Sequence, residues 1–169
     1  MSGAKNGTWR STCGKYTIHV RRDCIVEMVA LARTNAPNEV GTSLVGSYSD
    51  DGYTATVTRL APIAQDSRGA RFTFERGARG LMTFFRTVFA DSKGTIHYVG
   101  EWHSHPGGEP RPSGTDDASM FAIAKNRKAL CPECLLVILA IRGEDVRLGA
   151  FVYSEKRGRV DLVELTNGT

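Results

Sequence analysis

The order in which strand-like and helix-like segments alternate is the feature that most restricts the fold of this chain. Period-two alternation of apolar and polar side chains, or a short apolar run between turn residues, predicts β-strands in several segments. These segments are residues 15–20, 41–48, 53–60, 71–74, 95–103, 135–141, 146–153 and 159–165. The second and third of them are separated by the turn sequence SDDG, which predicts an antiparallel hairpin.

Between these strands lie three segments in which apolar residues recur at helical spacing. Asp23 is a candidate N-cap for a first helix, which is expected to end before the sequence NAPNE. A second helix is expected over 78–92, and a third over 115–130, with acids in its first turn and bases in its last. The pattern predicts an α/β (α+β) fold, in which helices flank a curved, mixed and mainly antiparallel sheet. One domain is expected over 1–169, with residues 1–14 as a candidate flexible extension.

Composition and charge exclude several classes of protein. At 169 residues, with 41% hydrophobic and 24% charged content, the chain is long enough to bury one core. Its net charge of +4 comes from basic residues interleaved with acids, as in RRDCIVEMVALAR, which argues against a nucleic-acid-binding patch. No apolar run of ~18 residues is present, and MSGAKNGTWRSTCGK lacks the apolar stretch of a secretory signal. We therefore expect a cytoplasmic protein that does not span a membrane.

The four cysteines raise the question of a structural metal or a disulfide. In the sequence CPEC, Cys131 and Cys134 have a spacing that suits a metal ion or a redox pair. A structural zinc site normally takes four ligands, however, and Cys13 and Cys24 form no second paired motif. We expect free thiols at a helix-to-strand junction, with a metal or disulfide role as the alternative.

The segment GEWHSHPGGEPRPSGTDDASM carries the residues with the clearest chemistry. Because a strand alternates faces, His103 and His105 project from the same side and their imidazoles can converge on one ion. Asp116 follows across a loop whose glycines and prolines permit the chain to return. Two imidazole nitrogens and one carboxylate oxygen are the ligands of a hydrolytic zinc site with an open fourth position. Without Asp116, the histidines would more simply be hydrogen-bonded core or surface residues.

A hydrolytic zinc site also needs a general base that is not a ligand. Glu39, in NAPNEVGTSLVG, is the candidate because it begins a strand whose edge could lie beside the histidine strand. Spacing alone does not distinguish Glu39 from an ordinary exposed acid. Glu101 is nearer in the sequence and has the same strand parity as the histidines. It is therefore either a residue that orients a ligand or a solvent-facing acid.

These residues carry a family resemblance. The pattern HSHP, followed by Ser113 and Asp116, resembles the full signature of the JAMM metalloproteases, the catalytic branch of the MPN (JAB) domains. The upstream sequence EVGTSLVG is similar to that family's segment around its catalytic glutamate, here Glu39. The resemblance extends from about the first helix to the end of the chain. It is greatest to bacterial JAB proteins found beside ubiquitin-like conjugation enzymes in anti-phage islands, including deconjugases of cyclic-nucleotide defence systems.

The resemblance implies a fold of the MPN/JAB type and a role for each matching residue. His103, His105 and Asp116 would bind one Zn²⁺ per chain, and Glu39 would take a proton from the attacking water and pass it to the leaving amine. Ser113 would donate a hydrogen bond to the oxyanion. The reaction would be hydrolysis of the peptide or isopeptide bond after the C-terminal glycine of a ubiquitin-like protein. The extended tail of that substrate could pair with an exposed strand edge, and conjugation enzymes are further expected partners.

Several alternatives stay open at this level. The side chain of Ser113 is also suited to be the N-cap of the helix that starts near Thr115. Asp117 is expected to be a solvated acid in the first turn of that helix. The chain could instead trim a sulfur-carrier protein or a small amide, because its loops carry no readable specificity. The bacterial RadC group, a DNA-associated module, shares the HxHP motif, but no dense basic patch supports that role here. A non-catalytic MPN scaffold would have lost the metal ligands.

Overall fold

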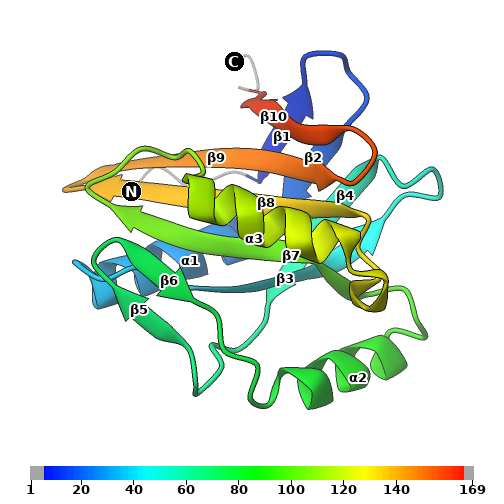
Figure 1. Ribbon diagram of the computed structural model, residues 1–169, viewed down its shortest axis with the longest axis horizontal. Helices are drawn as coiled ribbons and strands as arrows, with labels where there is room; N and C mark the ends of the chain where they lie inside the picture. The colour runs from blue at the N-terminus through cyan, green and yellow to red at the C-terminus, as the bar shows by residue number, and fades with distance from the viewer. Residues whose placement is uncertain (1–5, 166–169) are drawn as a thin grey trace.

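A closed sheet of eight strands forms the centre of the structure (Figure 1). The computed structural model describes residues 6–165. Along the sheet the strands follow the order β1-β10-β9-β8-β7-β3-β4-β2. Their bounds are β1 (Gly7–Ser11), β2 (Thr17–Val20), β3 (Gly41–Tyr48), β4 (Thr54–Leu60), β7 (His97–Pro106), β8 (Glu133–Arg142), β9 (Asp145–Ser154) and β10 (Gly158–Glu164).

Antiparallel pairing dominates this sheet, as predicted. Among the described strands the parallel pairs are β2 with β4 and β7 with β8, and the other neighbours are antiparallel. The predicted hairpin across SDDG is confirmed, since β3 pairs antiparallel with β4. A separate hairpin consists of β5 (Arg68–Ala70) and β6 (Thr73–Glu75). The strand expected over 71–74 overlaps the second half of this hairpin, whose first half the sequence did not indicate.

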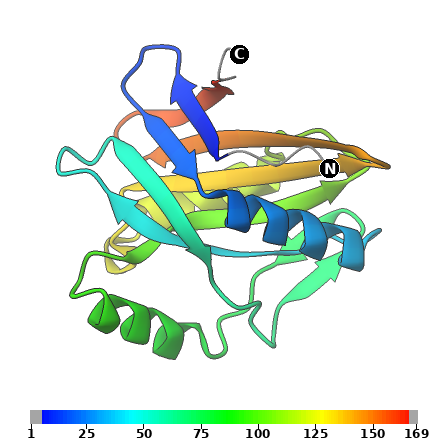
Figure 2. The same ribbon diagram turned by 180° about the vertical axis from the view of Figure 1, so that it is seen from behind.

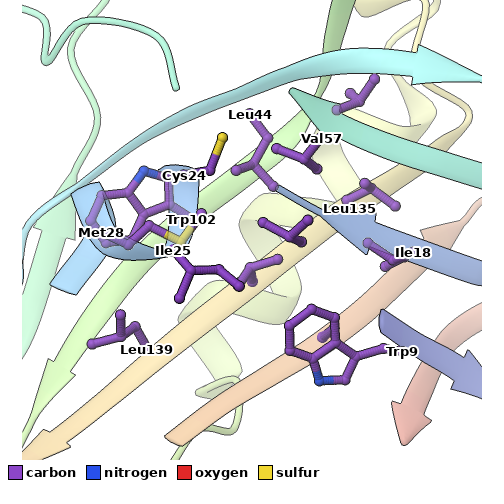
Figure 3. Close-up of a cluster of buried hydrophobic side chains, with 14 of the residues drawn as sticks. Trp9, Ile18, Cys24, Ile25, Met28, Leu44, Val57, Trp102, Leu135 and Leu139 are labelled. Carbon is purple, nitrogen blue, oxygen red and sulfur yellow. The ribbon is translucent and has the colours of Figure 1, made fainter. Parts of the chain in front are cut away.

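The expectation of a flexible extension over 1–14 is wrong for the residues of β1. This strand pairs with β2 on one side and with β10 on the other. Its side chains alternate between buried and more exposed positions, and Trp9 is only 1% exposed (Figure 3). Burial of so large an apolar side chain favours pairing of this segment with the sheet. Residues 1–5 lie outside the described residues.

Two helices cover opposite faces of the sheet (Figures 1 and 2). The first, α1 (Arg22–Asn35), packs Met28 and its neighbours into the main core. The second, α3 (Gly114–Lys125), packs Met120 against the outer face of β8 and β9. The helix expected over 115–130 therefore ends early, and a short 3₁₀ helix, η1 (Arg127–Ala129), follows it.

Asp23 does not cap α1, contrary to expectation. The helix begins at Arg22, and Arg21 occupies the N-cap position without a side-chain cap. Asp23 lies inside the first turn, where its carboxylate pairs with the Arg21 guanidinium at 2.6 Å and accepts the Cys24 N–H at 3.0 Å. An acid in the first turn still favours the helix electrostatically.

Strand β8 is buried on both faces because it lies between these helices. Leu135 and Leu139 belong to the core beneath α1, whereas Leu136 and Ile138 face α3. Burial on both faces explains why the sequence LLVILAI is apolar without alternation. Figure 3 shows Leu135 and Leu139 in the same cluster as Trp102, whose predicted place in the core is confirmed.

The helix α2 (Leu81–Asp91) stands at one end of the molecule, away from α1 and α3 (Figure 1). Its buried residues are Leu81 and Val88, whereas Met82 is 62% and Phe89 51% exposed. The apolar face predicted from helical spacing is therefore only partly covered. None of the helices in the described part of the chain is long and apolar enough to cross a membrane.

Pairing between β3 and β7 brings the residues before β3 next to the histidines. Gly41 pairs with His103, and a side chain at Gly41 would collide with the His103 Cα and Cβ. Hydrogen bonds between Val40 and Ser104 continue the pairing by one residue. As a result, Glu39 lies beside the C-terminal part of β7.

Candidate active site

The two histidines of β7 converge on one point. Both project from the same side of the strand, as its alternation requires, and their Nε2 atoms lie 3.1 Å apart. His103 is 7% exposed, and the side chain of His105 is 14% exposed. Both imidazoles are thus largely withdrawn from solvent, but neither is sealed in the core.

Asp116 lies opposite the histidines, in the first turn of α3. Its Oδ1 atom is 3.3 Å from His103 Nε2, and its Oδ2 atom is 3.7 Å from His105 Nε2. Ser113 is the N-cap of this helix: its Oγ accepts the Asp116 N–H, and its own N–H donates to Asp116 Oδ2 at 2.7 Å. This capping box holds the Asp116 carboxylate at the start of the helix.

These three residues fit a zinc ion. Ligands placed tetrahedrally at ~2.0–2.1 Å from zinc lie ~3.3 Å from one another. The two Nε2 atoms are 3.1 Å apart, and each lies 3.3 or 3.7 Å from the carboxylate oxygen of Asp116 that is nearer to it, Oδ1 for His103 and Oδ2 for His105. His105 Nδ1 lies 3.0 Å from the Glu109 carbonyl oxygen, and a proton donated there leaves Nε2 free to bind an ion. Within residues 6–165, His103, His105 and Asp116 are the group of His, Cys, Asp and Glu side chains whose donor atoms lie close enough together to share one metal ion.

The ionisation of the cluster also favours metal binding. Burial alone would raise the pKa of the Asp116 carboxyl, but His103 and the hydrogen bonds from Ser113 lower it well below its ordinary value. Burial, together with the neighbouring His103, lowers the pKa of His105. An ionised carboxylate and a neutral imidazole are the forms that bind zinc.

Glu39 lies in the same cavity, although it is not part of the ligand group. Burial raises the pKa of Glu39 to about 7; His103 opposes this shift, and the charge of Asp116 adds to it. A carboxyl group with a pKa near neutrality can exchange protons during catalysis at physiological pH. The structure therefore brings Glu39 to the three candidate ligands, which follow it in the sequence by more than sixty positions.

The cavity around these residues has a volume of about 340 Å³. One wall is the β5–β6 hairpin, through its turn and β6, and another is the loop that follows β7. The lining residues are Glu39, Arg71, Phe72, Thr73, Phe74, His105, Pro106, Gly107, Gly108, Ser113, Thr115 and Asp116. The sequence did not identify the hairpin wall. The alternation of Phe72 and Phe74 in RFTF was its one local signal, and it does not reveal where the hairpin packs.

Glu101 is not the solvent-facing acid that the sequence allowed. It is 8% exposed and lies outside the cavity lining. Its carboxylate pairs with the Arg76 guanidinium at 3.0 Å and accepts hydrogen bonds from Tyr98 and Ser43. Burial raises the pKa of Glu101, and Arg76 opposes that shift. Strand parity could not indicate these partners, because they come from three different parts of the chain.

Ser113 and Asp117, at the start of α3, both make hydrogen bonds within the fold. The capping expectation for Ser113 is confirmed, and its hydroxyl donates to Asp116 Oδ2 at 2.7 Å. Asp117 is not merely solvated, which corrects the expectation from the sequence. It accepts the Tyr153 hydroxyl at 2.6 Å and pairs with Arg159 at 3.0 Å, which ties α3 to β9 and β10.

The CPEC pair is confirmed as free thiols at a helix-to-strand junction. Cys131 lies between η1 and β8, and Cys134 lies near the start of β8. They are 1% and 0% exposed, within the apolar cluster beneath α3. The alternative of a metal site has no support there, since neither belongs to a converging ligand group in the described part of the chain.

Comparison with known proteins gives consistent matches. A family model described as prokaryotic homologs of the JAB domain matches residues 21–151. A protein of Enterobacter hormaechei named CD-NTase/cGAS isopeptidase is 42% identical over 135 residues, which covers 80% of this chain and 73% of that protein. A Pseudomonas aeruginosa protein of the same name is 34% identical over 77 residues, covering 46% of this chain and 48% of the relative.

The fold is also found in a solved structure. The solution structure of protein DSY2949 from Desulfitobacterium hafniense matches with a TM-score of 0.58 and 23% identity, covering 85% of this chain and 88% of that chain. This likeness concerns the fold alone, and it agrees with the predicted mixed α/β architecture. The extent of the family match and the identity to the Enterobacter protein confirm the resemblance drawn from the motifs. The chain belongs to the prokaryotic JAB domain family.

Proposed function

We propose that this protein is a zinc-dependent isopeptidase that cleaves conjugates in a bacterial anti-phage defence system. The observation that carries the proposal is the convergence of His103, His105 and Asp116 at a cavity that also contains Glu39. The relatives named CD-NTase/cGAS isopeptidase support the same class of reaction. The bond cut is the amide that joins the C-terminal glycine of one protein to an amine. The protein that contributes this C-terminal glycine, and that is released by the cleavage, is a ubiquitin-like protein or a CD-NTase.

The residues of the cavity divide the chemical work. His103, His105 and Asp116 would hold the zinc ion, which when bound would supply Lewis acidity for the hydrolysis. Glu39 accepts the proton of the attacking water and returns it to the leaving amine, a role that its place in the cavity beside the ligand group allows. Ser113 lines the cavity, and its hydroxyl, which donates to Asp116 Oδ2 in this structure, would turn to donate to the oxyanion while its Oγ still caps α3.

The extended C-terminal tail of the substrate needs an unpaired strand edge. Each strand of the closed sheet already has a neighbour on both sides. The strand β6, by contrast, pairs only with β5 among the described strands, and its residues Thr73 and Phe74 line the cavity. We therefore assign the tail to the free edge of β6, where main-chain hydrogen bonds would lead it to the metal ligands.

Two fusion proteins test this function. A ubiquitin-like protein and a CD-NTase from the same bacterium are each joined through their native C-terminus to a fluorescent protein. Zinc-loaded wild-type protein should cut at least one of them directly after the native C-terminal residue, as read by mass spectrometry. A chelator should stop the cleavage, and added zinc should restore it. If the zinc-loaded protein cuts neither fusion, the proposed function is wrong.

A further inference from the structure

The hairpin of β5 and β6 walls the cavity, yet it buries little of its own surface. All of β5 is exposed, and Phe74 is the half-buried residue of β6. Phe72, at the turn, is 78% exposed. Phe74 stacks loosely on His103, with ring centroids 6.5 Å apart. Because an isolated two-stranded hairpin is at best marginally stable in water, polar contacts must hold it in place.

Most polar contacts at the base of the hairpin are local. The Asp66 carboxylate accepts the backbone N–H groups of Ala78 and Arg79 at 3.0 and 2.9 Å. Ser67 Oγ accepts the Gly77 N–H at 3.0 Å. These bonds join the two ends of the hairpin segment to each other. They close the loop, but they do not attach it to the sheet.

Among the described residues, polar contacts attach the hairpin to the sheet at two points. On the β5 side, the Glu39 N–H donates to the Ala70 carbonyl at 2.9 Å. On the β6 side, Arg76 follows the strand directly, and its Nε lies 3.0 Å from Glu101 Oε1 on β7. The second contact adds an ion pair to the loose stacking of Phe74 on His103, and so fixes the end of the free-edge strand to the strand of the histidines.

The surroundings of Glu101 make this ion pair more than a surface contact. The Glu101 side chain is 11% exposed, and that of Arg76 is 32% exposed. The Tyr98 hydroxyl donates to Glu101 Oε1 at 2.8 Å, and Ser43 Oγ lies 3.2 Å from it. A carboxylate taken out of water needs a charged partner, so Glu101 favours the position of the chain that brings Arg76 to it.

We propose that Arg76 and Glu101 are positioning residues, whose ion pair holds the β5–β6 hairpin over the cavity and thereby sets the affinity for the substrate tail. The affinity part of this inference rests on the proposed function. Neither side chain lines the cavity, and neither belongs to the ligand group. Loss of the pair should therefore weaken substrate binding and leave the chemical step almost unchanged.

Hydrogen exchange tests the structural part without any substrate. Arg76→Gln is the variant to use, because Glu101 lies only two residues from His103. The matched control is Arg79→Gln, an exposed arginine in the same segment. We expect Arg76→Gln to speed amide exchange in β5 and β6 by ~10-fold, with β8 and the zinc content unchanged. Arg76→Lys, which keeps the charge, should restore part of the protection. Unchanged exchange in the hairpin of Arg76→Gln would overturn the inference.

Kinetics on the fusion proteins described above test the affinity part. For Arg76→Gln we expect KM to rise ~10-fold with kcat within ~2-fold of the wild type, whereas Arg79→Gln should match the wild type. A lower kcat at unchanged KM would contradict a role in affinity. If the wild-type protein cuts neither fusion, the proposed function fails and the affinity part fails with it. The exchange result still decides whether the ion pair holds the hairpin.

Discussion

Two clusters of potential metal ligands lie at opposite ends of the same pair of strands. Strands β7 and β8 run parallel, with Gly100 beside Leu135 and His105 beside Ala140. The histidines therefore lie toward the C-terminal ends of these strands, whereas Cys134 lies near the N-terminal end of β8. Both clusters show a ligand-like spacing in the sequence, but their surroundings in the fold differ.

Burial and ionisation separate the two clusters. The cysteines are packed among apolar side chains, with the Tyr98 hydroxyl 3.7 Å from the sulfur of Cys134. Burial raises the pKa of the Cys134 thiol well above its ordinary range, which keeps it protonated. At the other end, hydrogen bonds lower the pKa of Asp116, and a third ligand arrives from a separate helix. Spacing along one strand thus suggests ligands, but a third donor and an open cavity make a site.

Removal of a ligand is the strongest way to break this comparison. In His103→Ala we expect the zinc affinity to fall by more than the ~10–100-fold that loss of a supporting partner costs at metal sites, and cleavage to be abolished. Zinc content by mass spectrometry and cleavage of the fusion proteins measure the two effects. Cys134→Ala is the matched control and should retain one zinc per chain. A normal zinc content in His103→Ala would place the metal elsewhere.

A substitution at Glu39 should separate binding of the metal from chemistry. In Glu39→Gln we expect full zinc content and a kcat lower by ~10²–10⁴-fold, because a general base contributes about that much. Glu109→Gln is a suitable control, since Glu109 is an exposed acid of the loop after β7 whose side chain pairs with Arg147. Turnover of Glu39→Gln at the wild-type rate would assign the base to another residue.

The cysteine cluster should respond in stability alone. We expect Cys134→Ala to lower the free energy of unfolding by ~1–2 kcal/mol, since it truncates a fully buried side chain. Urea denaturation measures this change, and kcat should stay at the wild-type value. If Cys134→Ala lost zinc while its fold stayed intact, the cysteines would take part in metal binding, and the contrast between the two clusters would be wrong.

The pH dependence of the metal-free protein gives the smallest effect. Burial raises the pKa of Glu39 from its ordinary 4.5 to about 7, so between these values the folded protein keeps a proton that the unfolded chain has lost. Stability should therefore fall as the pH rises through this window, by an amount that partial solvent exposure of Glu39 keeps small. Titration of the Glu39 carboxyl by NMR checks the value, and Glu39→Gln should lack the slope. A midpoint near 4.5 would contradict the burial of this group.

Much of the fold could be predicted because local patterns carried it. The β3–β4 hairpin, the strand of the histidines and the buried run LLVILAI were all evident from alternation and turn residues. The strand β1 was missed because Gly7–Ser11 is short and its partners, β2 and β10, lie far apart in the sequence. The closure of the sheet depends on such long-range pairs, which no local pattern encodes.

The sequence by itself determined the family and the set of candidate ligands, because the HSHP motif and the spacing of His103, His105 and Asp116 follow from strand alternation and one loop. The tertiary structure alone decided which of the two candidate acids lies at the cavity. Glu39 reaches the cavity and Glu101 turns away from it to meet Arg76, although Glu101 is the nearer of the two in the sequence. The physical reason is that the neighbours of a side chain across a sheet are set by pairing with other strands. Those neighbours, rather than spacing along the chain, determine its burial and its charge.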